Sequence, residues 1–186
     1  MINRLSVNDL PDFEIIRMIK HEHNTNLFGI LYVRYSNKVF EKCNSLLKDP
    51  EMAQEFVQDI FCKIFEKRSD FRGESNFSTW LYSITYNHCI EYLRVKKKMN
   101  YPDWNSSHEL PEVIDEIDDK ELNSERLMQI MEKIHPEEKA LLTMHYIDNF
   151  PIAYIQTALK ISESATKMRL KRARERVAYL YSQEYK

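Results

Sequence analysis

The chain has 186 residues, of which 43% are apolar, and a formal net charge of −2. Two glycines and six prolines are too few for the many tight turns of a sheet-rich fold, and no apolar run approaches the roughly 20 residues that cross a membrane. The three cysteines form no CxxC pair, and the six histidines show no metal-ligand spacing. We therefore expect an all-α, cytoplasmic protein without metal, cofactor or direct membrane insertion.

Apolar residues recur at helical spacing along the first half of the chain. The pattern predicts a short helix that begins near Asp12, which we expect to be its N-cap, and a long helix over residues 27–47. Asp49 and Pro50 then provide a cap and a first-turn proline for a third helix, which runs to about residue 68. The outer face of the third helix is polar and suits either solvent or a protein partner.

The stretch from Phe71 to Lys98 begins as a polar loop, continues as an aromatic-rich helix and ends in a cluster of lysines. Exposed rings beside cations suit unstacked nucleic-acid bases and their phosphates. Aromatic residues at helical spacing are also ordinary core residues, and terminal lysines are often a solvated helix end, so both interpretations stay open. The residues expected in the core of this helix are Ile84, Ile90, Leu93, Trp80 and Leu81.

Residues 99–122 differ from their neighbours in charge and pattern. Residues 100–125 hold nine acidic side chains against Lys120 alone, a net charge of −8, so the remainder of the chain carries +6. Prolines interrupt any helical pattern here. We interpret residues 99–122 as an acidic linker, and the positive remainder is compatible with a nucleic-acid partner despite the negative total.

The second half of the chain predicts a helix-turn-helix. Helical patterns cover residues 122–133 and a segment that starts at His135 and Pro136, where acids follow at the positive end of the helix dipole. A short helix from Pro151, a brief turn and a basic helix capped by Ser162 complete the layout. A basic amphipathic helix can also bind membranes or calmodulin-like grooves, but the capped turn and the apolar helix before it favour DNA.

Three blocks of sequence resemble, in this order, the motifs of bacterial RNA polymerase sigma factors. The first is Met52-Ala-Gln-Glu-Phe-Val-Gln-Asp-Ile-Phe61. The second is Phe77-Ser-Thr-Trp-Leu-Tyr-Ser-Ile-Thr-Tyr-Asn87, followed by Ile90-Glu-Tyr-Leu-Arg94. The third is Arg169-Leu-Lys-Arg-Ala-Arg-Glu175. The length and layout resemble the extracytoplasmic-function (ECF) subgroup, which keeps only the second and fourth conserved regions.

The resemblance implies two small helical domains joined by the acidic linker, the C-terminal one a helix-turn-helix. Residues 1–98 are expected to form the region 2 domain, which binds core polymerase and the −10 element. Residues 123–186 are expected to form the region 4 domain, which binds the −35 element. In the family the segment between them, here 99–122, threads through the polymerase; a disordered tether is the alternative interpretation.

The resemblance also implies partners. In the family, the helix that holds the first block docks on the β′ clamp of core RNA polymerase, and the β flap is a second contact. Promoter DNA and an anti-sigma factor are further implied partners, and no small-molecule substrate is expected. The implied polymerase-binding residues are Gln54, Glu55, Gln58 and Asp59.

A third implication concerns the −10 element. In the family, the loop before the last helix of the first domain captures a base flipped from the non-template strand. A pocket that reads and stacks this base offsets the cost of unpairing it. An Asn side chain can both donate to and accept from a base edge, and cations hold the adjacent phosphates. The implied positions are Phe71, Arg72, Gly73, Ser75, Asn76, Ile84, Asn87, Arg94, Lys96 and Lys97.

The last helix is expected to read the −35 element in the major groove, where Arg or Lys to guanine is the commonest specific contact. Three places depart from the family pattern. Tyr154-Ile-Gln156 replaces Glu-Ile-Ala, Lys160 replaces the turn Gly, and Ala165-Thr166 replaces the Thr-Val start of the recognition helix. Gln156, in place of a small Ala between the two helices, bears on how they pack, and Lys160 must adopt the conformation of the turn. The implied DNA-binding positions are Ser164, Lys167, Met168, Arg169, Lys171 and Arg172. Among the arginines, Arg169 and Arg174 are expected to be phosphate or structural contacts rather than base-reading residues.

These patterns indicate an alternative sigma factor that has no catalytic activity of its own. The main alternative is a helix-turn-helix regulator that acts without core polymerase, which leaves the block at residues 52–61 without a purpose. An enzyme is a second alternative, but the sequence offers no phosphate-cradling Gly loop, metal constellation or nucleophile–base pair.

Overall fold

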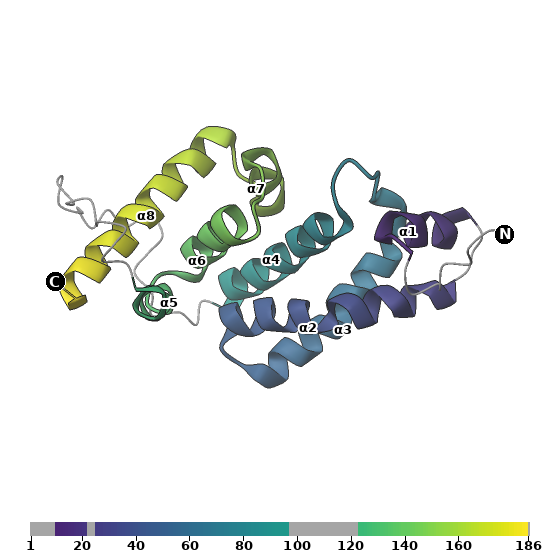
Figure 1. The fold of residues 1–186 in the computed structure, drawn as a ribbon, viewed down its shortest axis with the longest axis horizontal. Coiled ribbons are helices and arrows are strands. Elements are labelled where there is room, and N and C mark those ends of the chain that lie inside the picture. The colour runs from purple at the N-terminus through teal and green to yellow at the C-terminus, as the bar shows by residue number, and fades with distance from the viewer. Residues whose placement is uncertain (1–9, 22–24, 97–122, 186) are drawn as a thin grey trace. The chain divides into compact units, whose positions relative to one another are not determined.

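The computed structural model describes residues 10–21, 25–96 and 123–185 (Figure 1). Its regular elements are all helical over these ranges, which confirms the all-α fold class. None of the described helices is long and apolar enough to cross a membrane. The chain divides into two compact units, Met1–Glu91 and Tyr92–Lys186. The acidic linker predicted at residues 99–122 lies outside the described residues, so the predicted domain limits stay a prediction.

The first unit contains three long helices preceded by a short one. Their order is α1 (Asp12–His21), a 3-10 turn η2 (Thr25–Leu27), α2 (Phe28–Leu47), α3 (Pro50–Glu66), a 3-10 turn η3 (Arg68–Asp70) and α4 (Phe77–Lys96). The last residues of α4, from Tyr92 on, fall in the second unit.

The connection between α2 and α3 forms as predicted. Lys48 ends α2 in the left-handed conformation, with φ of 57°. The Asp49 carboxylate then accepts a hydrogen bond of 3.1 Å from the backbone N–H of Met52, and Pro50 occupies the first turn of α3. This cap satisfies one of the donors that every helix leaves unpaired at its start.

Asp12 is not the N-cap of α1 that the sequence predicted. It is the first residue of α1, and the Pro11 carbonyl accepts from the backbone N–H groups of the first turn. The Asp12 carboxylate instead accepts 2.6 Å from Arg34 Nη1 and also accepts from the Tyr35 hydroxyl, both on α2. Burial, followed by the hydrogen bond to Asp12, raises the pKa of Tyr35. The carboxylate therefore ties α1 to α2.

The buried stripe of α4 lies on a different side from the one predicted. Ile90 and Leu81 are buried as expected, whereas Ile84, Leu93 and Trp80 are only half-buried. The other buried residues of α4 are aromatic residues, a threonine and a cysteine, which a search for aliphatic residues at helical spacing overlooks: Phe77, Tyr82, Thr85, Tyr86 and Cys89.

The second unit consists of shorter helices and one long basic helix. Their order is α5 (Ser124–Met131), α6 (Pro136–Leu142), a π-helical turn η4 (Thr143–Ile147), α7 (Ile152–Leu159) and α8 (Glu163–Tyr185).

The start of α6 confirms the prediction and adds a detail. His135 is the N-cap, and its Nδ1 accepts 3.2 Å from the backbone N–H of Glu137. The Glu138 carboxylate accepts 3.2 Å from the backbone N–H of His135, which completes a reciprocal capping box. Burial raises the pKa of Glu138, and Arg176 of α8, 3.4 Å away, opposes that shift.

The helix-turn-helix accommodates Lys160 and Gln156, two of the departures from the family pattern. Lys160 adopts the left-handed conformation that the turn requires, with φ of 55°. Gln156 is half-buried, and its carbonyl accepts 3.0 Å from the backbone N–H of Ile161. The Ser162 hydroxyl accepts 3.2 Å from the backbone N–H of Ala165, so the predicted cap of α8 is confirmed.

We predict that Asp49→Ala lowers the free energy of unfolding by about 1 kcal/mol, because the backbone N–H of Met52 loses its partner. Asp49→Asn keeps an oxygen acceptor at the cap and should stay close to wild type. Denaturant titrations followed by circular dichroism measure both variants. An Asp49→Ala protein as stable as wild type would contradict this cap.

Candidate nucleic-acid and partner interfaces

The loop before α4 is built on a buried ring. Phe71 is only 5% exposed, and its ring packs against Phe77 at 5.8 Å and Trp80 at 5.4 Å between centroids. The ring is thus buried in this structure, and the assignment of Phe71 to a base pocket stays a prediction. Its ring supports the loop from inside the unit, and the exposed part of the loop begins at Arg72.

The exposed part of the loop turns at Gly73. Its φ of +76° lies in the region that side-chain-bearing residues rarely adopt. Arg72, Gly73 and Asn76 are exposed, and Ser75 is half-buried. The structure therefore presents a polar loop with one cation at the start of α4, as the sequence indicated.

Two of the predicted base-reading residues share one face of α4. Ile84 and Asn87 are three residues apart on the helix, and both are half-buried. Arg94 and Lys96 are exposed near the end of α4, and the Lys96 amino group lies 4.8 Å from the centre of the Tyr92 ring. Lys97 lies outside the described residues.

Sequence reasoning missed a polar cluster between α3 and α4. Lys63 Nζ lies 2.6 Å from Nδ1 of His88, whose ring packs on Phe56 at 4.5 Å between centroids. The other ring nitrogen, Nε2, is buried without a hydrogen bond and lies 3.9 Å from the Asp59 carboxylate. Burial and then the Lys63 charge lower the pKa of His88, while Asp59 acts against them. Lys63 and His88 are far apart in sequence, so no local sequence pattern predicts their contact.

The four predicted polymerase-binding residues lie together on the outside of α3. Gln54, Glu55, Gln58 and Asp59 are all exposed, while the opposite side of the helix is buried. Their spacing places them on adjacent turns of one face.

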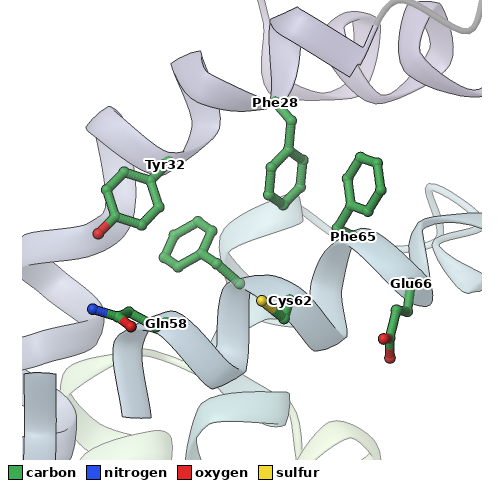
Figure 2. A pocket seen from close by; sticks show the side chains of 7 residues that line it. Phe28, Tyr32, Gln58, Cys62, Phe65 and Glu66 are labelled. Carbon is green, nitrogen blue, oxygen red and sulfur yellow. The ribbon is translucent and has the colours of Figure 1, made fainter. Parts of the chain in front are cut away.

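An apolar pocket of about 460 Å³ lies beside this face (Figure 2). The ring of Phe28 packs on Phe65 at 5.1 Å, and the ring of Tyr32 packs on Phe61 at 4.8 Å, so α2 and α3 form its walls. Gln58, Cys62 and Glu66 also line it. Phe28 and Phe65 have the helical spacing of core residues, and the sequence gives no signal for a pocket, because half-buried and fully buried rings have the same spacing.

The basic helix α8 presents the predicted −35 residues on its outer side. Ser164, Lys167, Lys171 and Arg172 are exposed, and Met168 is 48% exposed among them. Lys167 lies 2.6 Å from Glu163, which lowers the pKa of that carboxyl mainly through the hydrogen bond.

Arg169 lies differently from its neighbours on α8. It is half-buried, with Nη1 3.8 Å from the carboxylate of Glu137 on α6. Burial lowers its pKa, and the Glu137 charge opposes that shift. This placement fits a residue that fixes α8 to α6 better than one that reads bases. Within the described residues, His, Cys, Asp and Glu form no group of three that could hold a metal ion.

Comparison with known families matches both units. The pattern of Sigma-70 region 2 matches residues 31–99, and that of Sigma-70, region 4 matches residues 124–177. The chain belongs to the sigma-70 family. The ECF RNA polymerase sigma factor SigW of Bacillus subtilis is 27% identical over 76% of this chain and 81% of its own length. The ECF RNA polymerase sigma-E factor of Escherichia coli is 27% identical over 81% of this chain and 84% of its own.

Solved structures agree in fold. CnrH, in complex with the cytosolic domain of CnrY, is similar over 93% of this chain and 98% of its own, with a TM-score of 0.61 and 17% identity. Bartonella quintana RpoE, in complex with the anti-sigma factor NepR, is similar over 86% and 98%, with a TM-score of 0.58 and 15% identity. The predicted family, the ECF type and the function as an alternative sigma factor are thereby confirmed.

We predict that His88 makes the stability of this sigma factor depend on pH. Its lowered pKa means that the unfolded chain binds a proton more readily than the folded chain. The stability that neutral His88 contributes is complete above the ordinary histidine pKa of about 6.5 and is lost as the pH falls below it. His88→Gln should flatten the stability profile below about pH 6.5.

The matched control is His21→Gln, which removes an exposed histidine and should retain the wild-type slope. Urea titrations at each pH measure the free energy of unfolding. Parallel slopes for wild type and His88→Gln would contradict the assignment.

Proposed function

We propose that this sigma factor opens promoters by holding a flipped non-template base between the Arg72–Asn76 loop and the Ile84 and Asn87 face of α4. The observation that carries the proposal is the exposed loop, turned at Gly73 and set at the start of the helix that presents Asn87. Opening a duplex costs unpairing and unstacking energy, which contacts to the extruded base offset. Lys96 supplies charge for the phosphates along the same helix, whereas the Arg94 guanidinium donates to the Glu137 carboxylate at 2.6 Å.

The exposed face of α3 is proposed to dock on core RNA polymerase. Its two glutamines and two acids make this face polar and negatively charged. The apolar pocket beside them adds apolar surface that a partner could bury, which exposed polar residues alone do not provide. Interfaces commonly combine an apolar centre with a polar rim. The complex of RpoE with an anti-sigma factor supports the proposal that a protein of that class also binds this chain.

The outer side of α8 is proposed to read the −35 element. Lys167, Met168 and Lys171 project from a helix whose capped start follows a tight turn, which is the geometry of a recognition helix. Arg169 is assigned to holding α8 on α6 through Glu137. The chain itself has no catalytic role in this proposal, since polymerase performs the chemistry, and the setting is the cytoplasm.

Transcription from purified components tests the proposal. The chain is added to core polymerase, and promoters are recovered from a genomic library by sequencing the transcripts. Transcription from defined start sites, preceded by shared −35 and −10 sequences, is expected. DNA binding that is specific but independent of core polymerase would instead establish the helix-turn-helix regulator.

We predict that Asn87→Ala reduces promoter opening about ten-fold, because a base-edge contact worth ~1–3 kcal/mol is lost. Binding to core polymerase should not change, since Asn87 is on α4 rather than on the exposed face of α3. Open-complex formation and a core pull-down are measured in parallel. An equal loss in both assays would show that the variant misfolds.

We predict that Lys167→Ala changes the preferred −35 sequence, because an exposed cation on the recognition helix is removed. Selection from a library with a randomised −35 element reports the preference. Arg174→Ala serves as the comparison, because loss of a phosphate contact weakens all sequences alike. An unchanged preference for Lys167→Ala would refute its assignment to base reading.

A further inference from the structure

Helix α1 is fastened to the loop that precedes α4. The amino group of Lys20 donates hydrogen bonds to the backbone carbonyls of Ser69, at 3.1 Å, and Phe71, at 2.5 Å. Figure 1 shows α1 beside this part of the chain, although the two segments are far apart in sequence. The Lys20 amino group thus holds the segment that leads into the loop by its main-chain carbonyls, whatever side chains that segment carries.

Phe13, near the start of α1, touches the same loop where it turns. A Cβ atom placed on Gly73 would lie 2.7 Å from Cε2 and 3.2 Å from Cδ2 of the Phe13 ring. The ring edge therefore rests directly against the glycine backbone. Gly73 is required here twice, for its φ of +76° and for the absence of a side chain under the ring.

The rest of the Phe13 side chain faces solvent. Phe13 is 56% exposed, and it is a rigid aromatic residue beside an exposed polar loop. A single exposed apolar residue is common on protein surfaces, but its position against the turn of the loop is specific. Exposed aromatic rings are surfaces on which unpaired bases stack.

The charges around Phe13 permit a nucleic-acid strand to approach. Asp12 is paired with Arg34 at 2.6 Å, and Glu14 is paired with Arg17. Each acid next to Phe13 is thus balanced by an arginine. In the loop itself Arg72 and Glu74 are both exposed, so the loop carries no net charge.

We propose that Phe13 of α1 is a stacking residue for an unpaired base of the non-template strand, next to the base held by the loop. The proposal rests on the proposed function, because it needs the loop to bind single-stranded DNA. It extends the site beyond the three sequence blocks to a helix that lies before the first of them. Lys20 is the positioning residue that keeps the loop against the edge of the Phe13 ring.

The test uses the full chain bound to core polymerase. The probe is a fork-junction DNA from a promoter recovered in the transcription assay, with 2-aminopurine at successive non-template positions of the −10 element. The fluorescence of this base falls when it stacks on a ring. Phe13→Ala should weaken probe affinity about ten-fold and restore fluorescence at one position, as the loss of one stacking contact requires.

Phe13→Tyr keeps a ring and should match wild type. Val33→Ala removes another exposed apolar side chain, 79% exposed on α2, and should also match wild type. The inference is overturned if Phe13→Ala binds the probe with unchanged affinity and fluorescence, or if the variant loses core binding instead, which would make Phe13 a protein contact.

Asn87→Ala, measured on the same probe, distinguishes failure of the proposed function from failure of the assignment of Phe13. If Asn87→Ala weakens binding and Phe13→Ala does not, the proposed function stands and the inference about Phe13 fails. If neither variant changes binding, both fail. Thermal unfolding of each variant confirms that the chain is folded.

Discussion

The packing of α4 on α2 is the constraint on which the first unit depends. The Sγ atoms of Cys89 and Cys43 lie 3.6 Å apart in the core, and both thiols are free. The Lys42 amino group lies 4.3 Å from the centre of the Tyr82 ring and 3.3 Å from the Tyr86 hydroxyl. These contacts fix the rotation of α4 about its axis. That rotation decides which residues of α4 remain exposed.

The loop before α4 is held by contacts with two helices, α4 and α1. The buried Phe71 ring anchors it to α4, and Lys20 binds its first carbonyls from α1. Preorganisation of this kind favours binding, because a loop already held in place loses less conformational entropy when a strand is captured. In the second unit, Glu137 and Glu138 of α6 face Arg169 and Arg176 of α8, so these two basic residues fix the helix, while Lys167, Lys171 and Arg172 remain exposed.

The sequence was sufficient for helix positions and for the family, because caps such as Asp49 and Ser162 and the three motif blocks are local signals. It was not sufficient for the rotation of α4. Apolar periodicity cannot count Thr85, whose hydroxyl donates to the Leu81 carbonyl, as a core residue. The contacts of His88 with Lys63, of Asp12 with Arg34 and of Phe13 with Gly73 join separate segments. No spacing rule predicts such pairs, because they depend on how the helices pack.

Permanganate footprinting of a promoter bound by core polymerase and this chain tests the central claim most directly, because permanganate oxidises thymines only where they are unstacked. The account predicts reactive thymines in the −10 element with the wild-type chain, and their loss when Asn87 is replaced although the complex still forms. A complex that contains core polymerase and promoter but shows no reactive thymine with the wild-type chain would contradict it.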